Sequence, residues 1–234
     1  MQEALSKLKE GLSVSAAIVG FTDNGWVKID IEGQDREIFQ EIISREFGVA
    51  QVDLAQIENQ SSYLGIVNAV GSDLAVDIGM ERPASLNVAV SPRALRAQLC
   101  DGKLISCKEI TEHYCIHNGS KLAIRVTRLD RDARRLEGWL ADSQIELFSD
   151  QIASRLERIQ VFDCTRQRIE FALRTLNLQR DVISVEPNTL TTHSVVCKLG
   201  TNAIGLIPKL GSVLRRSGMM PFLPGRIVAR CRQW

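Results

Sequence analysis

The residues of this chain whose types and spacing could hold a metal ion are two histidines and the residues near them. His113 and His117 lie four positions apart, which places both on one face if the segment is helical. Glu109 lies one turn earlier, and Cys107 and Cys115 are close in sequence, so the donor types suit Zn²⁺. The spacing matches no zinc finger and no HExxH motif. We therefore expect no metal and no cofactor, with His113 and His117 as weak metal candidates.

Phosphate binding is the second chemistry that the residue types suggest. The formal charge is −6 for residues 1–58, −1 for 59–150 and +8 for 151–234, so the basic end is the better match for a polyanion. Residues 226–234 alternate apolar residues with arginine, which predicts a strand that carries guanidinium groups on one side. That side is either a phosphate surface or a charged edge strand that prevents aggregation. The residues that we expect to contact nucleic acid are Arg125, Arg128, Arg131, Arg134, Arg135, Arg215, Arg216, Arg226, Arg230, Arg232 and Trp234.

Nothing in the sequence is typical of a catalytic centre. No nucleophile–base pair or carboxylate pair can be placed together, and Gly200-Thr201-Asn202 lacks the remainder of a phosphate-binding loop, so a turn is expected there. Only the two histidines support an enzyme. We expect a protein that is not an enzyme.

Composition narrows the class of protein. The chain has 234 residues, of which 44% are apolar and 24% charged, as in ordinary globular proteins. Its six cysteines form no CxxC pair and are expected to be reduced and buried. No apolar run is long enough to span a bilayer and no secretory signal is apparent, so we expect no membrane contact and a cytoplasmic protein.

The elements that must position these residues fall into three expected domains. Residues 1–58 are expected to form an acidic α+β domain that could also contact protein partners. Its expected elements are a helix over 2–9, a β-hairpin of 13–19 and 26–31 around Asp23-Asn24-Gly25, a helix from Asp35 to Gly48, and a strand over 51–57.

Residues 59–141 are expected to form a five-stranded β-barrel with a helical insertion. Gly65, Val67 and Val70 alternate toward one side, and residues 74–79 return after a Gly-Ser-Asp turn. Residues 122–129 and 135–140 predict a second hairpin around a basic turn. Between the hairpins, one helix is expected over 92–99 and another from the capping box at Ser106 to Asn118-Gly119.

The pattern G-x-V-x-x-V followed by VDIG resembles the first hairpin of the S1-like RNA-binding domain, an OB-fold barrel. The strand that ends in Asp130 and its basic turn resemble the last hairpin of that family. The resemblance implies RNA binding. Two aromatic residues that stack on nucleotides in the family correspond here to Ser72 and Ala75, so the usual stacking platform is missing.

Residues 142–234 are expected to form a basic α+β domain. A capping box at Ser143–Glu146 opens a helix, and a β-α-β unit follows, with strands over 159–162 and 182–185 around a helix capped by Thr165. Residues 194–198 and 204–207 predict a hairpin before a short helix over 209–216. A helix from Asn202 would contain Pro208, which costs about 3 kcal/mol, so the hairpin is preferred. The elements are compatible with a ferredoxin-like sheet.

The order of the three units and the stretch VVCKLGTNAIGLIP also resemble an uncharacterised archaeal protein family, domain of unknown function 2110. That resemblance implies no mechanism. The sequence as a whole predicts an α+β protein that binds RNA without catalysis, in translation, transcription or RNA processing. The alternative is a protein–protein adaptor or scaffold subunit that uses the barrel without contacting RNA.

Overall fold

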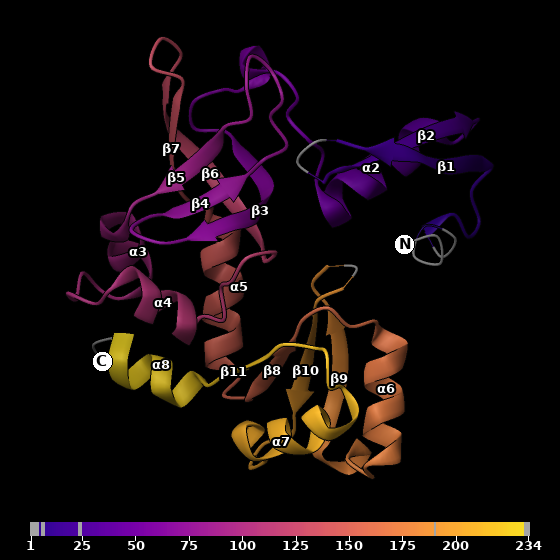
Figure 1. Cartoon of the computed structure of the whole chain (residues 1–234), viewed down its shortest axis with the longest axis vertical. Coiled ribbons are helices and arrows are strands. Elements are labelled where there is room, and N and C mark those ends of the chain that lie inside the picture. The colour runs from indigo at the N-terminus through magenta and orange to yellow at the C-terminus, as the bar shows by residue number, and fades with distance from the viewer. Residues whose placement is uncertain (1–4, 6–7, 23–24, 190, 232–234) are drawn as a thin grey trace.

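The computed structural model describes residues 5, 8–22, 25–189 and 191–231. It shows an α+β protein with a closed five-stranded barrel in the middle and a smaller sheet on either side (Figure 1). The expected α+β class and central barrel are confirmed. The predicted helix over 2–9 and the turn residues Asp23 and Asn24 lie largely outside the described residues.

The N-terminal unit is a two-stranded antiparallel sheet covered by one helix. Its elements are β1 (Val14–Phe21), β2 (Val27–Gly33), α2 (Arg36–Phe47) and the 3-10 helix η1 (Leu54–Gln56). Alternate residues of both strands pack against the buried Phe39 and Ile43 of α2. The predicted strand over 51–57 is wrong, because the Asp53 carboxylate accepts a hydrogen bond from the Ala55 N–H and starts a 3-10 turn instead.

The barrel has the strand order β3-β4-β5-β7-β6 and is closed by pairing of β3 with β6. Neighbouring strands are antiparallel except β5 and β7, which are parallel. This arrangement, with helices between the third and fourth strands, is OB-like. The strands are β3 (Ser62–Val70), β4 (Leu74–Asp77), β5 (Asn87–Val90), β6 (Lys121–Asp130) and β7 (Arg135–Leu140), and the helices are α3 (Pro92–Leu99) and α4 (Cys107–His113).

Helix α5 (Asp142–Ala153) leaves the barrel and buries Phe148 and Ile152 against its hydrophobic core. The predicted capping box at Ser143 is not formed, because the helix begins two residues earlier than that box implies, at Asp142, with Ala141 as its N-cap. Gln144 is buried, and its side-chain oxygen accepts a hydrogen bond from the Ala123 N–H of β6. The first turn is therefore fixed by the barrel rather than by its own cap.

The C-terminal unit is a four-stranded antiparallel sheet in the order β11-β8-β10-β9, built from a β-α-β-β-α-β chain. This is the ferredoxin-like arrangement. Its elements are β8 (Arg158–Val161), α6 (Arg166–Thr175), the 3-10 helix η2 (Gln179–Asp181), β9 (Val182–Pro187), β10 (His193–Cys197), α7 (Ala203–Val213) and β11 (Met219–Phe222). Its sheet and two helices share a core separate from that of the barrel.

The predicted hairpin with a strand over 204–207 is wrong, because this segment is the helix α7. Asn202 caps it by accepting a hydrogen bond from the Gly205 N–H. Pro208 lies inside the helix on its exposed side, while Leu206 and Leu210 are buried. Burial of two leucines stabilises the fold by about 3–6 kcal/mol, which offsets the proline penalty of about 3 kcal/mol.

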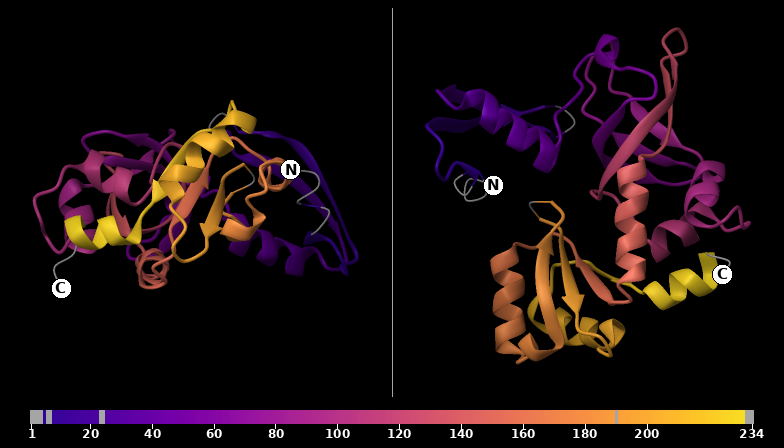
Figure 2. Two further views of the ribbon diagram at one scale, coloured as in Figure 1. Left: turned by 90° about the horizontal axis from the view of Figure 1, so that it is seen from below. Right: turned by 180° about the vertical axis from the view of Figure 1, so that it is seen from behind.

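The predicted strand over 226–234 is also wrong as far as it is described, because residues 224–231 form the helix α8 (Pro224–Cys231). The alternating pattern places Ala229 with Ile227 and Cys231, but Ala229 is exposed. The helical period instead buries Pro224, Ile227 and Cys231. Helix α8 packs against α4 and α5 beside the barrel, as both views of Figure 2 show.

All six cysteines are free and buried, as expected. None of the described helices combines the length and apolar character needed to cross a bilayer.

Candidate nucleic-acid interface and the cleft beside the barrel

The β6–β7 hairpin extends beyond the barrel and carries most of its arginines (Figure 1). Leu136, Gly138 and Leu140 of β7 point into the barrel, so the alternate residues of the strand lie on its outer surface. The Asp130 carboxylate accepts a hydrogen bond from the Ala133 N–H at 2.8 Å and closes the turn. Arg134 follows in the left-handed conformation, with φ 51°.

Four arginines form what we call the basic hairpin, namely Arg128, Arg131, Arg134 and Arg135, and all four are exposed. Arg135 pairs with Glu137 at 3.2 Å, and Arg131 lies 3.5 Å from the carbonyl oxygen of Ile57. Arg128 and Arg134 form no ion pair within the described part of the chain. The basic hairpin therefore has guanidinium groups available for phosphate.

Arg125 has a different role from the basic hairpin. Its guanidinium makes two hydrogen bonds to the Asp142 carboxylate, at 3.1 and 3.3 Å. Asp142 lies in the first turn of α5, so this bidentate pair attaches the helix to β6. Arg125 is thus already paired, although sequence reasoning grouped it with the phosphate-binding arginines.

The C-terminal arginines lie apart from the basic hairpin. Arg226 and Arg230 are exposed on α8, and Arg230 pairs with Glu109 of α4 at 3.1 Å. Arg215 and Arg216 are exposed just after α7. The hairpin tip and α8 lie at opposite ends of the barrel in Figures 1 and 2, so the arginines of α8 do not share a surface with those of the basic hairpin. Arg232 and Trp234 lie outside the described residues.

Trp139 is a candidate that sequence reasoning missed. It is 43% exposed on the outer surface of β7 and lies opposite Arg125 in the pairing of β6 with β7. An indole ring there can stack on a base beside the basic hairpin. The signal was present in the sequence, because alternation in 135–140 places Trp139 on the same side as Arg135.

The two histidines do not form the expected helical pair, because α4 ends at His113 and the chain turns through Cys115 with φ 53°. The His117 ring packs on Phe162 of the C-terminal unit, with 3.5 Å between ring centroids. Burial lowers the pKa of His117. Among the described residues, no group of three His, Cys, Asp or Glu side chains gathers to hold a metal.

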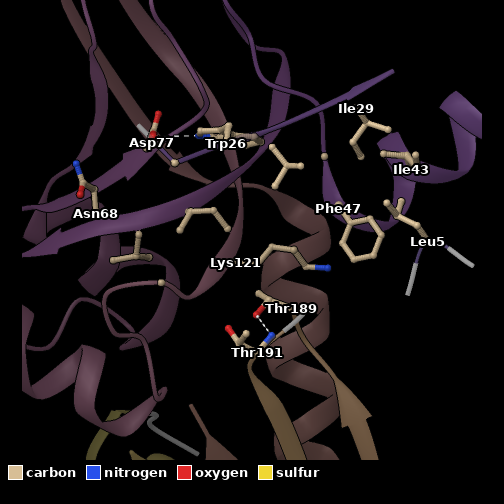
Figure 3. A pocket seen from close by; sticks show the side chains of 16 residues that line it. Leu5, Trp26, Ile29, Ile43, Phe47, Asn68, Asp77, Lys121, Thr189 and Thr191 are labelled. Atoms are coloured by element: carbon tan, nitrogen blue, oxygen red, sulfur yellow. Dashed lines mark hydrogen bonds between the residues drawn. The ribbon is translucent and has the colours of Figure 1, made fainter. Parts of the chain in front are cut away.

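A cleft of about 440 Å³ lies where the N-terminal unit, the barrel and the β9–β10 connection meet (Figure 3). Ile29, Ile43 and Phe47 form one wall. The opposite wall comes from the row Asp77, Ile66 and Lys121, which are paired neighbours across β4, β3 and β6. Thr189 and Thr191 border the cleft below, as seen in the figure.

The hydrogen bond between Trp26 and Asp77 attaches the N-terminal unit to the barrel. The Trp26 indole N–H donates to Asp77 Oδ2 at 3.0 Å, and the Gly79 N–H donates to Asp77 Oδ1 at 2.7 Å. A Cβ on Gly79 would lie 2.3 Å from the Ala50 Cβ, so only glycine permits this close approach. Ala75, which the resemblance to the S1-like domain implied as a stacking position, lies two positions from Asp77 on β4. This side of the barrel is thus partly covered by Trp26.

Comparisons with known proteins match parts of the chain. A family model, the DUF2110 C-terminal domain, matches residues 156–220, which span the ferredoxin-like unit up to β11. No curated protein matches the sequence.

Two solved structures are similar at low level. One is an a/eIF2alpha-aDim2p-rRNA complex from Pyrococcus horikoshii OT3, with 12% identity, 52% of this chain covered and a TM-score of 0.28. The other is a multidomain protein with nucleic acid binding domains from Streptococcus pneumoniae TIGR4, with 10% identity, 82% of this chain covered and a TM-score of 0.23. The chain spans 64% and 47% of these structures' own lengths. Similarity at these TM-scores carries no argument about function.

Proposed function

We propose that this protein binds RNA without catalysing a reaction, and that the basic hairpin is its main contact with the phosphate chain. One observation carries the proposal. The arginine-rich turn connects the fourth and fifth strands of an OB-like barrel, and OB-folds bind oligonucleotides with the loop at this position.

The charge of this surface sets the expected strength of binding. Residues 125–139 contain five arginines and three carboxylates, and Arg125 and Arg135 are paired with acids. The remaining cations are Arg128, Arg131 and Arg134. Because few phosphates can be neutralised, binding is expected to be weak and sensitive to salt. Trp139 supplies a stacking surface, which is worth about 1–3 kcal/mol per base.

The test is fluorescence anisotropy of labelled single-stranded and structured RNA over a range of salt concentrations. Each phosphate contact with a single strand contributes about −0.7 to the slope of log affinity against log salt. Replacing Arg128, Arg131 and Arg134 by Gln should therefore reduce the slope by about 2.

The matched control replaces three other exposed arginines, Arg215, Arg216 and Arg226, by Gln, and so changes the net charge by the same amount. This control variant should retain most of the wild-type slope of log affinity against log salt. If the control loses as much as the hairpin variant, binding is not centred on the hairpin. If the folded wild-type protein binds neither RNA at low salt, the proposed function is rejected.

A second candidate function is that of a protein–protein adaptor. It is favoured because the N-terminal unit partly covers the barrel surface around Asp77 through Trp26. This function predicts partners that remain bound after nuclease treatment in a pull-down. Loss of every partner on nuclease treatment would exclude the adaptor.

A further inference from the structure

The cleft beside the barrel has the size and location of a small-molecule site. Its volume of about 440 Å³ lies within the range of about 300–1,000 Å³ that is usual for ligand pockets, and such pockets favour junctions between domains. Its walls are mainly aliphatic and aromatic, with Ile29, Ile43, Phe47 and Ile66 from two separate units. A ligand that enters here must therefore have an apolar body.

Two charged residues in the described part of the chain line the cleft, Asp77 and Lys121, and they differ in how completely their hydrogen-bonding groups are satisfied. Asp77 is 7% exposed, and both of its carboxylate oxygens accept hydrogen bonds, from Trp26 and Gly79. Its charge is already stabilised within the fold, so it does not require a cationic ligand.

Lys121 is less completely satisfied. Its ammonium donates one hydrogen bond, to the carbonyl oxygen of Glu46 at 2.9 Å, and forms no ion pair within the described part of the chain. Two N–H donors remain. Burial lowers the pKa of Lys121, and the nearby Glu46 carboxylate opposes that shift. A negatively charged hydrogen-bond acceptor would satisfy the remaining donors of this ammonium group.

We infer that the cleft binds a small carboxylic acid with an apolar body. Its carboxylate group would contact Lys121, and its hydrocarbon body would lie between the wall formed by Ile29, Ile43 and Phe47 and the strands of the barrel. A nucleotide strand fits less well. Among the described residues, Lys121 is the one cation that lines the cleft, and residues 1–58 beside it contain eleven acidic and five basic residues, which repel a chain of phosphates. The inference does not depend on RNA binding by the hairpin.

Isothermal titration calorimetry on the full chain tests the inference, with octanoate and 3-phenylpropionate as probes and octanol as the uncharged analogue. At least one acid should bind in the millimolar range or tighter, and octanoate should bind about tenfold more tightly than octanol. This comparison uses only the wild-type protein, so it is independent of how any variant folds. Failure of both acids to bind, or equal binding of octanoate and octanol, would overturn the inference.

A pair of variants locates the site. Lys121→Met keeps much of the side-chain length and should weaken octanoate binding about tenfold while leaving octanol unchanged. The matched control is Lys28→Met, because Lys28 lies on β2 between two cleft residues but points away and is exposed. Equal octanoate affinity in the Lys121→Met and wild-type proteins would place the ligand elsewhere and overturn the inference.

An apolar peptide with a free C-terminus presents the same chemistry as a small acid. A second arm of the titration therefore compares trileucine with its C-terminal amide. Binding of trileucine but not of its amide, lost in Lys121→Met, supports the carboxylate contact and identifies a peptide terminus as a competent source. Equal binding of the peptide and its amide counts against the contact.

Discussion

The Trp26→Phe substitution tests whether the hydrogen bond between Trp26 and Asp77 holds the N-terminal unit on the barrel. Phenylalanine retains an aromatic ring but lacks the indole N–H that donates to Asp77 Oδ2 at 3.0 Å. The buried carboxylate then loses one of its donors. A hydrogen bond to a charged group is worth about 1.5–3 kcal/mol, so we expect the free energy of unfolding to fall by about 2 kcal/mol.

The matched control is Trp139→Phe. Trp139 is 43% exposed and donates no hydrogen bond to the described residues, so its substitution should change the free energy of unfolding by no more than about 0.5 kcal/mol. Urea unfolding followed by circular dichroism gives both values. Hydrogen exchange should in addition show faster exchange in β2 and around residues 77–79 in Trp26→Phe. Equal stability of the two variants would refute the assigned role of this hydrogen bond.

Three further predictions concern the packing of the core, buried thiols and α7. In Gly138→Ala, the new Cβ would lie 2.6 Å from Val88 Cγ1, so urea unfolding should show a loss of about 1–3 kcal/mol, whereas Gly211→Ala in open space within α7 should gain about 1 kcal/mol. Equal effects would contradict the contacts around β7. Burial raises the pKa of Cys115 from 9.0 to about 12, so in this range the thiol ionises first in the unfolded chain, and stability should fall as pH rises from 9 toward 12. Unfolding curves of Cys115→Ala should show a shallower fall over the same pH range, and an unchanged profile would contradict the assignment. Pro208→Ala should raise the melting temperature, because it removes the penalty of a proline inside a helix, about 3 kcal/mol from the lost hydrogen bond and the clash of the ring together, and a lower melting temperature would argue against the helix.

The sequence was sufficient to predict elements in which one hydrophobic period is unambiguous. A strand over 135–140 and a helix over 92–99 were predicted, and the structure has them as β7 (Arg135–Leu140) and α3 (Pro92–Leu99). Neither prediction required knowledge of distant contacts.

Where the spacing of the apolar residues fits both a strand and a helix, tertiary packing decided which of the two forms. Ile227 and Cys231 suit both a strand and a helix, and α8 forms because that spacing lets both residues join the core of the barrel. In α7, burial of Leu206 and Leu210 overcame the proline penalty that had favoured a hairpin. Local propensity could not include these gains, since they depend on residues far away in the chain.

The arrangement of the sites was not predictable for the same reason. Trp26 and Asp77 are 51 positions apart, and no local pattern connects them. The arginines were identified by type, but whether the two groups share a surface depends on how α8 returns to the barrel. Trp139 differs from these cases: it was missed, although strand alternation alone would have placed it on the same side of β7 as Arg135.

Cross-linking of a 4-thiouridine-substituted RNA to the full protein, with peptide mapping by mass spectrometry, tests the central claim most directly. If RNA follows the basic hairpin, the cross-linked peptides should concentrate in residues 125–139, with Trp139 a principal site. Cross-links confined to α8 or to the ferredoxin-like unit, or none at low salt with folded protein, would contradict the account.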